Sequence, residues 1–433
     1  MSGQRILLKK IAGGGMVRVL SLALTFFSSV LLARLLGVED FGVYSYVLAL
    51  ISLLSIVPQA GIPTLLVRET AGKKIANDWG GIKGVWVWCN RYTIKASISC
   101  ALLLMVLDLF GFFSGESRTV LLIGLPLIPL VSLSVARSAA LRGLNFVIIG
   151  QLPESILKPL IMIVVAGLCW CVLDVLTAGM AMVLNVVVCG ISFFVGLMLL
   201  KKLAPREVRN VEPENDESKR WKAALLPLAI LGGAHTISSQ TGIVLVGYYE
   251  GDVQTAHYKI AVSVAMLGAS ALQITNMVLS PYVVSAYSAQ DENKLYNLTR
   301  LGSLTGLAFM LPVFGFFYLF GEGVLSVFYG EDFKGGYSSL VILLFGQLLN
   351  SFFGSTSLIM NMTGNEKQAL KWILCSSLLV LMLTIFLVPL YGATGAAYAS
   401  VAGLLFWNAA FWLYIKAKIG VDSSILSWFL PRK

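Results

Sequence analysis

The stretch LTAGMAMVLNVVVCGISFFVGLMLL fills positions 176–200 and contains no charged residue. A mostly apolar run of about 20 residues is long enough for a helix to cross the ~30 Å hydrocarbon core of a bilayer. The run does not alternate between apolar and polar residues, which favours a helix over a barrel strand. Lys201 and Lys202 follow at once, as basic residues do at the cytoplasmic end of a span. The stretch therefore predicts a transmembrane helix.

Similar runs recur along the chain, and together they predict an all-α membrane protein with about twelve transmembrane helices. The predicted spans are 19–36, 43–66, 94–113, 120–141, 156–173, 176–200, 223–249, 256–284, 301–320, 340–362, 373–390 and 393–415. Hydrophobic residues make up 57% of the chain and charged residues only 12%, far below the charged share of soluble proteins. Because so few charged residues cannot cover the surface of a soluble protein, we exclude the classes of soluble proteins.

Lysine and arginine are distributed unevenly between the predicted loops. With the amino terminus placed inside, the 32 Lys and Arg residues lie in cytoplasmic segments or at the inner ends of spans, with four exceptions. Arg34, Arg118 and Lys334 lie on the outer side, and Lys259 lies within a span. The 22 acidic residues divide almost evenly between the two sides. This bias follows the positive-inside rule and predicts that both termini are cytoplasmic. The net charge of +10 is then a topology signal, and we predict no nucleic-acid partner.

The longest predicted non-membrane stretches are 67–93 and 201–222, and the second is rich in charge and follows the sixth span. A linker between two six-helix halves is expected at that point. We therefore predict an N-terminal six-helix bundle at 1–200, a cytoplasmic linker at 201–222, a C-terminal six-helix bundle at 223–416 and a cytoplasmic tail at 417–433.

A weak internal repeat supports this division. Three positions at the junction of the first two spans recur 214 residues later, at the junction of the seventh and eighth spans. The pairs are Ala33 with Gly247, Gly37 with Gly251, and Tyr44 with Tyr258. The repeat predicts that both halves begin on the same side of the membrane.

The sequence offers little that suggests catalysis. It has no Walker lysine loop, and its two histidines, His235 and His257, belong to no cluster with metal-ligand spacing. The external loops are too small to gather the acids and bases of a membrane glycosyltransferase or polymerase. We therefore predict no catalytic residue, no cofactor and no metal, and a protein that is not an enzyme.

Basic residues within or at the ends of spans are candidate substrate ligands. A basic residue at a helix centre costs about 2.5–3.5 kcal/mol on insertion scales, so it usually faces a cavity or a partner. Guanidinium and ammonium groups bind phosphate oxygens well. Basic residues at inner helix ends have the alternative of snorkelling to anionic lipid, which applies to Arg68, Arg137, Arg142 and Lys158. The predicted cationic ligands are Arg34, Arg68, Arg142 and Lys259.

The most polar intramembrane stretch, 235–241, lies in the seventh span and contains His235 and Gln240. These two side chains are candidates for hydrogen bonds to sugar hydroxyls, and the alternative is hydrogen bonding between helices. No carboxylate lies at the centre of a span. Asp108, near the outer end of the third span, and Glu69, at the inner end of the second, are the candidate proton-coupling groups, because burial disfavours a carboxylate's charged form.

The sequence resembles the bacterial polysaccharide-export flippases of the O-antigen (Wzx) type. The resemblance begins with LLARLLG at 31–37, EDFGVY at 39–44 and VRE at 67–69. It continues with LVGYY at 245–249, YGEDF at 329–333, LLN at 348–350, NMTGNEK at 361–367 and YGATGAA at 391–397. These matches occur in family order over nearly the whole chain. One departure is that relatives often carry an acidic residue near 240–242, where this chain has Gln240, Thr241 and Gly242.

The resemblance implies two six-helix bundles around a central cavity, shared with multidrug and lipid-linked-precursor exporters. It implies a cargo of oligosaccharide on undecaprenyl pyrophosphate, moved to the outer leaflet of the bacterial inner membrane by alternating access for O-antigen or lipopolysaccharide synthesis. A polysaccharide polymerase and a chain-length regulator would be partners. The alternatives are a cation-coupled drug exporter, a peptidoglycan-precursor flippase, which usually has fourteen helices, and a membrane glycosyltransferase or polymerase.

Overall fold

The computed structural model describes residues 2–172, 176–214 and 217–428. Within these ranges the structure describes only the backbone of a few residues, namely 2–14, 16, 172, 226, 227, 230–232, 235 and 271. All regular secondary structure in the described part is helical, which confirms the predicted all-α fold class.

Nine helical segments of the described residues are long and apolar enough to cross a membrane. Two of them, Val17–Ile75 and Glu366–Lys418, are long enough to cross twice and each contains a sharp break. Each therefore corresponds to two predicted spans. The helix Ser218–Glu250 corresponds to a further predicted span, 223–249. The arrangement agrees with about twelve transmembrane crossings.

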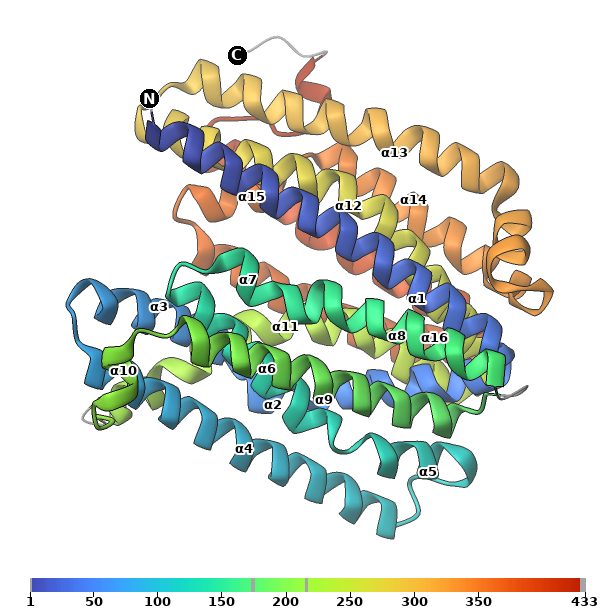
Figure 1. Cartoon of the computed structure of the whole chain (residues 1–433). Coiled ribbons are helices and arrows are strands. Elements are labelled where there is room, and N and C mark those ends of the chain that lie inside the picture. Colours follow the sequence, from blue (N-terminus) through green and yellow to red (C-terminus); the bar gives the residue numbers. More distant parts are fainter. Residues whose placement is uncertain (1, 173–175, 215–216, 429–433) are drawn as a thin grey trace. The chain divides into compact units, whose positions relative to one another are not determined.

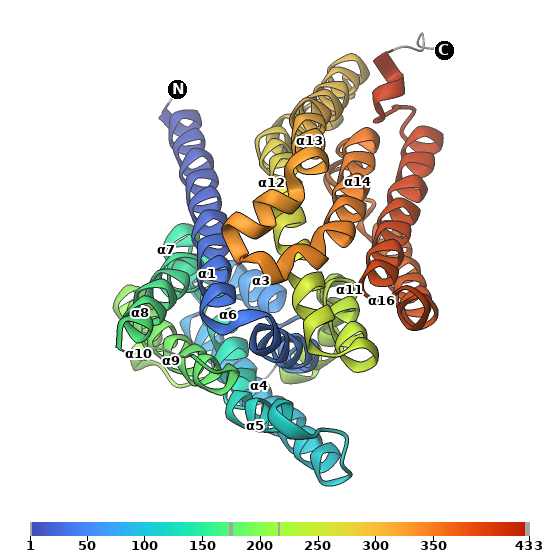
Figure 2. The ribbon, with the colours of Figure 1, turned by 90° about the vertical axis from the view of Figure 1, so that its right-hand side faces the viewer.

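The chain forms two compact units (Figures 1 and 2). We call Met16–Gln240 the first unit, and Met1–Gly15 with Thr241–Lys433 the second unit. One boundary between them falls inside the helix α1 (Ser2–Leu54) and the other inside the helix α11 (Ser218–Glu250). Each unit is described by itself below.

The first unit is built around α6 (Leu127–Gly143), which packs against α3 (Ile62–Ile75), α4 (Trp79–Leu109) and α9 (Ala178–Leu203). Its core includes Leu65, Val85, Ala139 and Trp221, all nearly inaccessible to solvent. The remaining helices of the unit are α1 (Ser2–Leu54) from Met16 on, α2 (Ile56–Gln59), α5 (Gly115–Gly124), α7 (Val147–Leu152), the π-helical turn η1 (Pro153–Leu157), α8 (Lys158–Val172) and α10 (Arg206–Asn210).

The second unit is built around α14 (Tyr337–Phe353), which packs against α12 (Asp252–Ser288), α13 (Glu292–Tyr329) and α16 (Glu366–Lys418). A core cluster at one end of the unit includes Ile359, Phe411 and Ile415. Shorter elements complete the unit, namely η2 (Glu331–Gly336), α15 (Thr356–Met362) and η3 (Ile425–Trp428).

The predicted non-membrane stretch 67–93 is helical along almost its whole length. Helix α3 continues to Ile75 and α4 begins at Trp79, leaving only a short turn. Asp78 is the N-cap of α4, and its Oδ1 accepts a hydrogen bond from the Gly81 backbone N–H at 2.7 Å. Charged residues such as Lys83 lower the local hydropathy, yet they leave the backbone ladder intact, so the helices extend past the apolar runs.

The internal repeat has a structural counterpart in each unit. Gly37 (φ 71°, ψ 179°) and Gly251 (φ 81°, ψ −170°) share a backbone conformation that favours glycine, and each separates two helices. Seven residues after each glycine comes a buried tyrosine. The Tyr44 hydroxyl accepts a hydrogen bond at 2.8 Å from Asn185 of α9, and the Tyr258 hydroxyl lies 3.0 Å from the Ser400 hydroxyl of α16. The repeated residues thus make equivalent contacts with the last span of their own unit.

Candidate substrate-binding site

Basic residues concentrate at one end of the first unit, where α3, α6 and α9 finish. Lys73 and Lys74 lie in the last turn of α3, Arg142 in that of α6, and Lys201 and Lys202 in that of α9. We call this the basic end. Lys74 donates a hydrogen bond to the Leu144 carbonyl at 2.9 Å, which holds α3 against the turn that follows α6. The last turns of these three helices therefore bring basic residues together at one end of the unit.

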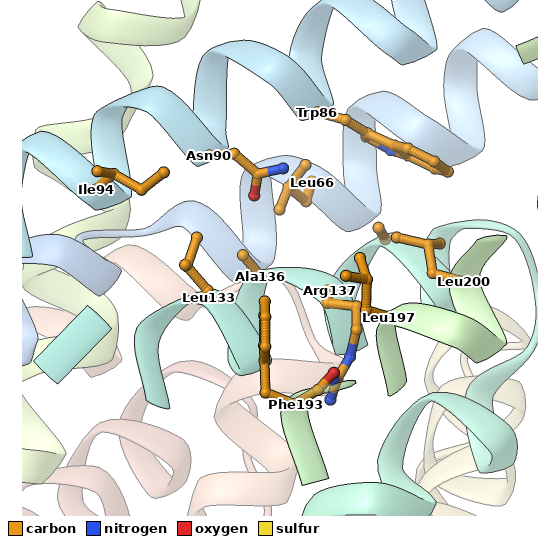
Figure 3. A pocket seen from close by; sticks show the side chains of 11 residues that line it. Leu66, Trp86, Asn90, Ile94, Leu133, Ala136, Arg137, Phe193, Leu197 and Leu200 are labelled. Carbon is orange, nitrogen blue, oxygen red and sulfur yellow. The ribbon is translucent and has the colours of Figure 1, made fainter. Parts of the chain in front are cut away.

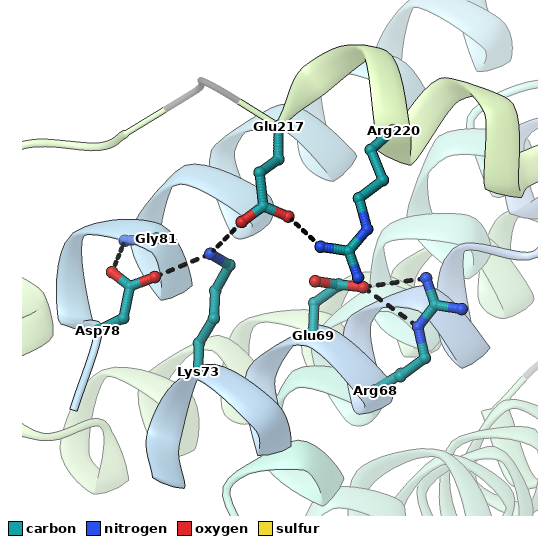
Figure 4. A network of polar contacts seen from close by, with 7 residues as sticks. All are labelled: Arg68, Glu69, Lys73, Asp78, Gly81, Glu217 and Arg220. Atoms are coloured by element: carbon teal, nitrogen blue, oxygen red, sulfur yellow. Dashed lines mark hydrogen bonds and ion pairs between the residues drawn. The ribbon is translucent and has the colours of Figure 1, made fainter. Parts of the chain in front are cut away.

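Arg68 and Glu69 form an ion pair on α3 (Figure 4). The Arg68 Nε and Nη2 groups both donate to Glu69 Oε1, at 3.1 and 2.9 Å. The Glu69 side chain is 6% exposed and that of Arg68 is 52% exposed. The buried carboxylate therefore orients a half-exposed guanidinium. Glu69 was predicted as a coupling group, and the structure places it as the partner of Arg68.

Arg142 occupies the neighbouring helix end. It is half-buried on α6, and its Nε is buried without a hydrogen-bond partner among the described residues. Gly143, the next residue, packs against Thr70 so closely that a Cβ there would lie 2.6 Å from the Thr70 Cβ. This close approach brings together the helix ends that carry Arg68 and Arg142.

Lys73 links the α3–α4 turn to the segment before α11 (Figure 4). Its ammonium lies 2.8 Å from Asp78 Oδ2 and 2.9 Å from Glu217 Oε1. Glu217 also accepts a hydrogen bond from Arg220 at 2.8 Å. The hydrogen bond from Lys73 is the main cause that holds the pKa values of both Asp78 and Glu217 below their usual range.

The segment between α10 and α11 is fixed to α4 by main-chain contacts as well. The Glu214 backbone N–H donates to the Gly80 carbonyl at 3.2 Å, and a Cβ at Gly84 would lie 1.7 Å from the Glu214 carbonyl oxygen. Lys83 donates hydrogen bonds to the carbonyls of Arg209 and Val211, at 3.0 and 2.6 Å. Only glycine permits this approach at position 84. The charged stretch predicted as a linker is therefore docked on the first unit along its described part.

Arg34 and Asp108 lie away from the helix ends that carry these groups. Arg34 is exposed on α1, three residues before the break at Gly37. Asp108 is buried near the end of α4 and pairs with Arg118 of α5, whose Nε lies 2.8 Å from Asp108 Oδ1 and 3.1 Å from Oδ2. The predicted coupling group Asp108 thus has a basic partner in the structure.

Lys259 lies in α12 of the second unit. It is half-buried, and among the described residues its ammonium has no hydrogen bond or ion pair. Its neighbour Tyr258 is fixed by the contact with Ser400, so the backbone that carries Lys259 is held in place. Gln240 is half-buried on α11 in the first unit. His235 belongs to the same helix, and its side chain lies outside the described residues.

Sequence reasoning missed a polar network inside the first unit. Arg137, interpreted as a cation at a helix end, is 5% exposed. Its Nη1 donates to the Phe193 carbonyl at 2.6 Å, and its Nη2 lies 3.2 Å from Glu154 Oε1. Ser192 donates to the Pro153 carbonyl at 2.8 Å and to the same Glu154 oxygen at 3.2 Å. The network ties α6, η1 and α9 together, and Glu154 directly after Pro153 was the only sequence signal for it.

An apolar groove of about 220 Å³ lies beside this network, between α4 and α9 (Figure 3). Residues of α6 and Leu66 of α3 complete its walls. It is lined by Leu66, Trp86, Asn90, Ile94, Leu133, Ala136, Arg137, Ala140, Phe193, Leu197 and Leu200. Asn90 and Arg137 are its only polar lining residues. No group of three or more His, Cys, Asp or Glu side chains gathers as a metal site within the described part of the chain.

Long apolar helices arranged in two units define an integral membrane protein. The sequence matches the family model of polysaccharide biosynthesis proteins over residues 7–287 and the MatE model over residues 227–386. Because the first match covers more than half of the chain, the protein belongs to the polysaccharide biosynthesis protein family. A comparison with curated protein sequences gives no significant match.

Solved transporter structures share the fold. An inward-facing multidrug resistance transporter of the MATE family has a TM-score of 0.75 at 16% identity, with 94% of this chain and 98% of that chain covered. The lipid II flippase MurJ, in an inward closed conformation, has a TM-score of 0.75 at 16% identity, with 96% and 90% covered. A MOP superfamily transporter from Pyrococcus furiosus has a TM-score of 0.64 at 16% identity, with 95% of each chain covered. These likenesses establish the fold of a MOP superfamily transporter or flippase.

Proposed function

We propose that this protein is a flippase that moves an oligosaccharide linked to undecaprenyl pyrophosphate, such as an O-antigen repeat unit, from the cytoplasmic to the periplasmic leaflet. It would act by alternating access in the bacterial inner membrane, with both termini in the cytoplasm. A polysaccharide polymerase and a chain-length regulator would use its product. Membership of the polysaccharide biosynthesis family and the shared fold with a lipid II flippase support this assignment.

The observation that carries the proposal is the unpaired ammonium of Lys259. A cation within a span is costly unless it meets a counter-ion or water, and no carboxylate pairs with Lys259 among the described residues. An anionic cargo supplies the missing charge. A cationic drug would instead favour acids in the transport path.

The proposed roles follow from the chemistry of each side chain. Arg34, Arg68, Arg142 and Lys259 attract the pyrophosphate, with the Arg68 guanidinium oriented for this by Glu69. His235 and Gln240 donate and accept hydrogen bonds with the sugars. The prenyl chain stays in lipid, so the protein shields only the polar part of the cargo. Asp108 and Glu69 stay the candidate coupling groups, and either would have to release its arginine partner to exchange a proton.

Deletion of the gene tests the function. The expected result is loss of surface polysaccharide together with accumulation of undecaprenyl-linked repeat units in the inner leaflet. Expression of the wild-type chain should restore both. Normal surface polysaccharide in the deletion strain, or loss of polysaccharide without accumulated lipid-linked units, would contradict the proposal, since the second pattern is that of a missing glycosyltransferase.

The MatE match over residues 227–386 favours a second candidate, a cation-coupled multidrug exporter. That function predicts that the deletion strain becomes more sensitive to cationic drugs while its surface polysaccharide is unchanged. The two candidates therefore give opposite results in the same strain.

A further inference from the structure

The groove between α4 and α9 opens at the exposed surface of the first unit. Asn90 and Ile94 form its mouth on α4, and both are exposed. Beyond the mouth, α4 presents Ile98 and Leu102, which are 54% and 55% exposed. On the other side, α9 presents Phe194 and Met198, which are 59% and 69% exposed. Exposed apolar side chains on both flanks of a groove between membrane-spanning helices face hydrocarbon.

The groove has the shape of a site for a hydrocarbon chain. Its α4 wall runs from Trp86 to Ile94, about 12 Å along the helix. Its floor is deep, because Leu66 and Ala136 are only 2% and 1% exposed. The Arg137 guanidinium on its wall is already bonded to the Phe193 carbonyl and Glu154. The lining therefore offers close apolar contact along its length and few polar groups to a ligand.

Cations stand at the basic end of the groove. Lys201 and Lys202 directly follow the lining residue Leu200, and both are exposed. An ammonium or guanidinium at this level can reach the phosphate of a lipid in the adjacent leaflet. The basic residues and the apolar groove are thus placed to match the phosphate and one acyl chain of an anionic lipid.

We propose that this groove binds one acyl chain of an anionic phospholipid from the leaflet at the basic end, with the phosphate held by Lys201 and Lys202. The bound chain bridges α4 and α9 over α6 and shields the wall that contains Arg137. Bulk phospholipid is the occupant because the flanks of the groove are exposed and apolar, and its lining has few polar groups to recognise sugars. This inference is independent of the transport function proposed above.

Native mass spectrometry of the purified full-length protein tests the site. The protein is titrated with dioleoyl phosphatidylglycerol and, separately, with dioleoyl phosphatidylcholine, which has the same chains and no net charge. The wild type should bind its first phosphatidylglycerol more tightly than its first phosphatidylcholine. Ile94→Trp should fill the mouth and weaken the first phosphatidylglycerol about tenfold, the equivalent of excluding roughly two methylene groups. The exposed position makes Ile94→Trp compatible with folding, and Asn90→Trp provides a second variant at the mouth.

Two controls make the result decisive. Ile98→Trp places the same side chain one turn further along the lipid-facing side of α4, outside the groove, and should bind phosphatidylglycerol like the wild type. The double variant Lys201→Gln with Lys202→Gln should lower phosphatidylglycerol binding to the phosphatidylcholine level. Equal effects of Ile94→Trp and Ile98→Trp would overturn the groove assignment. A headgroup preference that survives the double lysine variant would overturn the role of the two lysines.

Discussion

The ammonium of Lys73, near the end of α3, lies 2.9 Å from the carboxylate of Glu217, 144 residues later in the chain. The same ammonium contacts Asp78 at 2.8 Å, so one lysine joins the α3–α4 turn to the residues that precede α11. Its side chain is 14% exposed and is thus less screened than a surface cation. Lys73 therefore anchors the segment that leads into α11.

Replacing Lys73 by Met should release residues 206–214 from α4. The substitution removes both ion pairs but keeps the apolar stem, so the helix itself is preserved. Limited proteolysis of the segment should become several-fold faster, because cleavage follows the population of the undocked state. Lys219→Met is the matched control, since Lys219 is exposed and should tolerate the change. Equal cleavage rates in the two variants would contradict the anchoring role.

The same docking should weaken in acid. The pKa values of Asp78 and Glu217 are lowered in the folded protein by Lys73. Groups of this kind stabilise the folded state above their unfolded pKa, about 4, and lose that contribution as the pH falls through the lower folded value. Hydrogen exchange of 206–214, corrected for its intrinsic pH dependence, should therefore increase between about pH 5 and pH 3. Lys73→Met should show no such increase, because its carboxylates have lost their partner.

Gly196→Ala should destabilise the first unit. A Cβ at Gly196 would lie 2.0 Å from the Arg137 Cζ, so the guanidinium would have to leave its contacts with Glu154 and the Phe193 carbonyl. Overpacking of this kind costs about 1–3 kcal/mol, which thermal unfolding in detergent can detect. Gly190→Ala is the control on the same helix, because a Cβ there meets nothing within 4 Å. Unfolding temperatures that fall equally in both variants would point to a general effect of alanine on α9.

Lys259→Ala and Arg34→Ala should each abolish surface polysaccharide without loss of the protein from the membrane. Removing either cation removes attraction for the pyrophosphate. Lys259→Arg, which keeps the charge, should retain part of the export. The measurements are surface polysaccharide and membrane protein level in the complemented deletion strain. Full export by both alanine variants would contradict the assignment of these two ligands, while the flippase function itself would stand.

Hydropathy predicted the fold class because each span must be apolar along its own length. The all-helical architecture and the polysaccharide biosynthesis family were both confirmed. Helix ends were less predictable, as the early start of α4 at Trp79 shows. There the charged residues continue a helix outside the apolar run, and hydropathy responds to composition rather than to backbone hydrogen bonds.

Partners of the charged groups were beyond the reach of sequence reasoning. Asp108 and Glu69 were predicted as coupling groups from their positions near the ends of spans. Position along a span gives no information on the arginines that pair with them. The carboxylate that pairs with Arg137 is that of Glu154, which lies seventeen residues later in the chain, in the π-helical turn η1. These pairs depend on which faces of packed helices meet, and the predicted ligand set Arg34, Arg68, Arg142, Lys259, His235 and Gln240 stays a prediction for the same reason.

The twin glycine–tyrosine junctions, Gly37 with Tyr44 and Gly251 with Tyr258, indicate how the chain arose. Each half has the same break in its backbone at the glycine and the same tyrosine hydroxyl contact with its last span. Such a pair is expected when one gene has been duplicated. The tyrosine's partner differs between the halves, being the amide of Asn185 in the first and the hydroxyl of Ser400 in the second. The ancestral six-helix protein would then have worked as a pair of identical subunits, and each modern half has since been free to specialise.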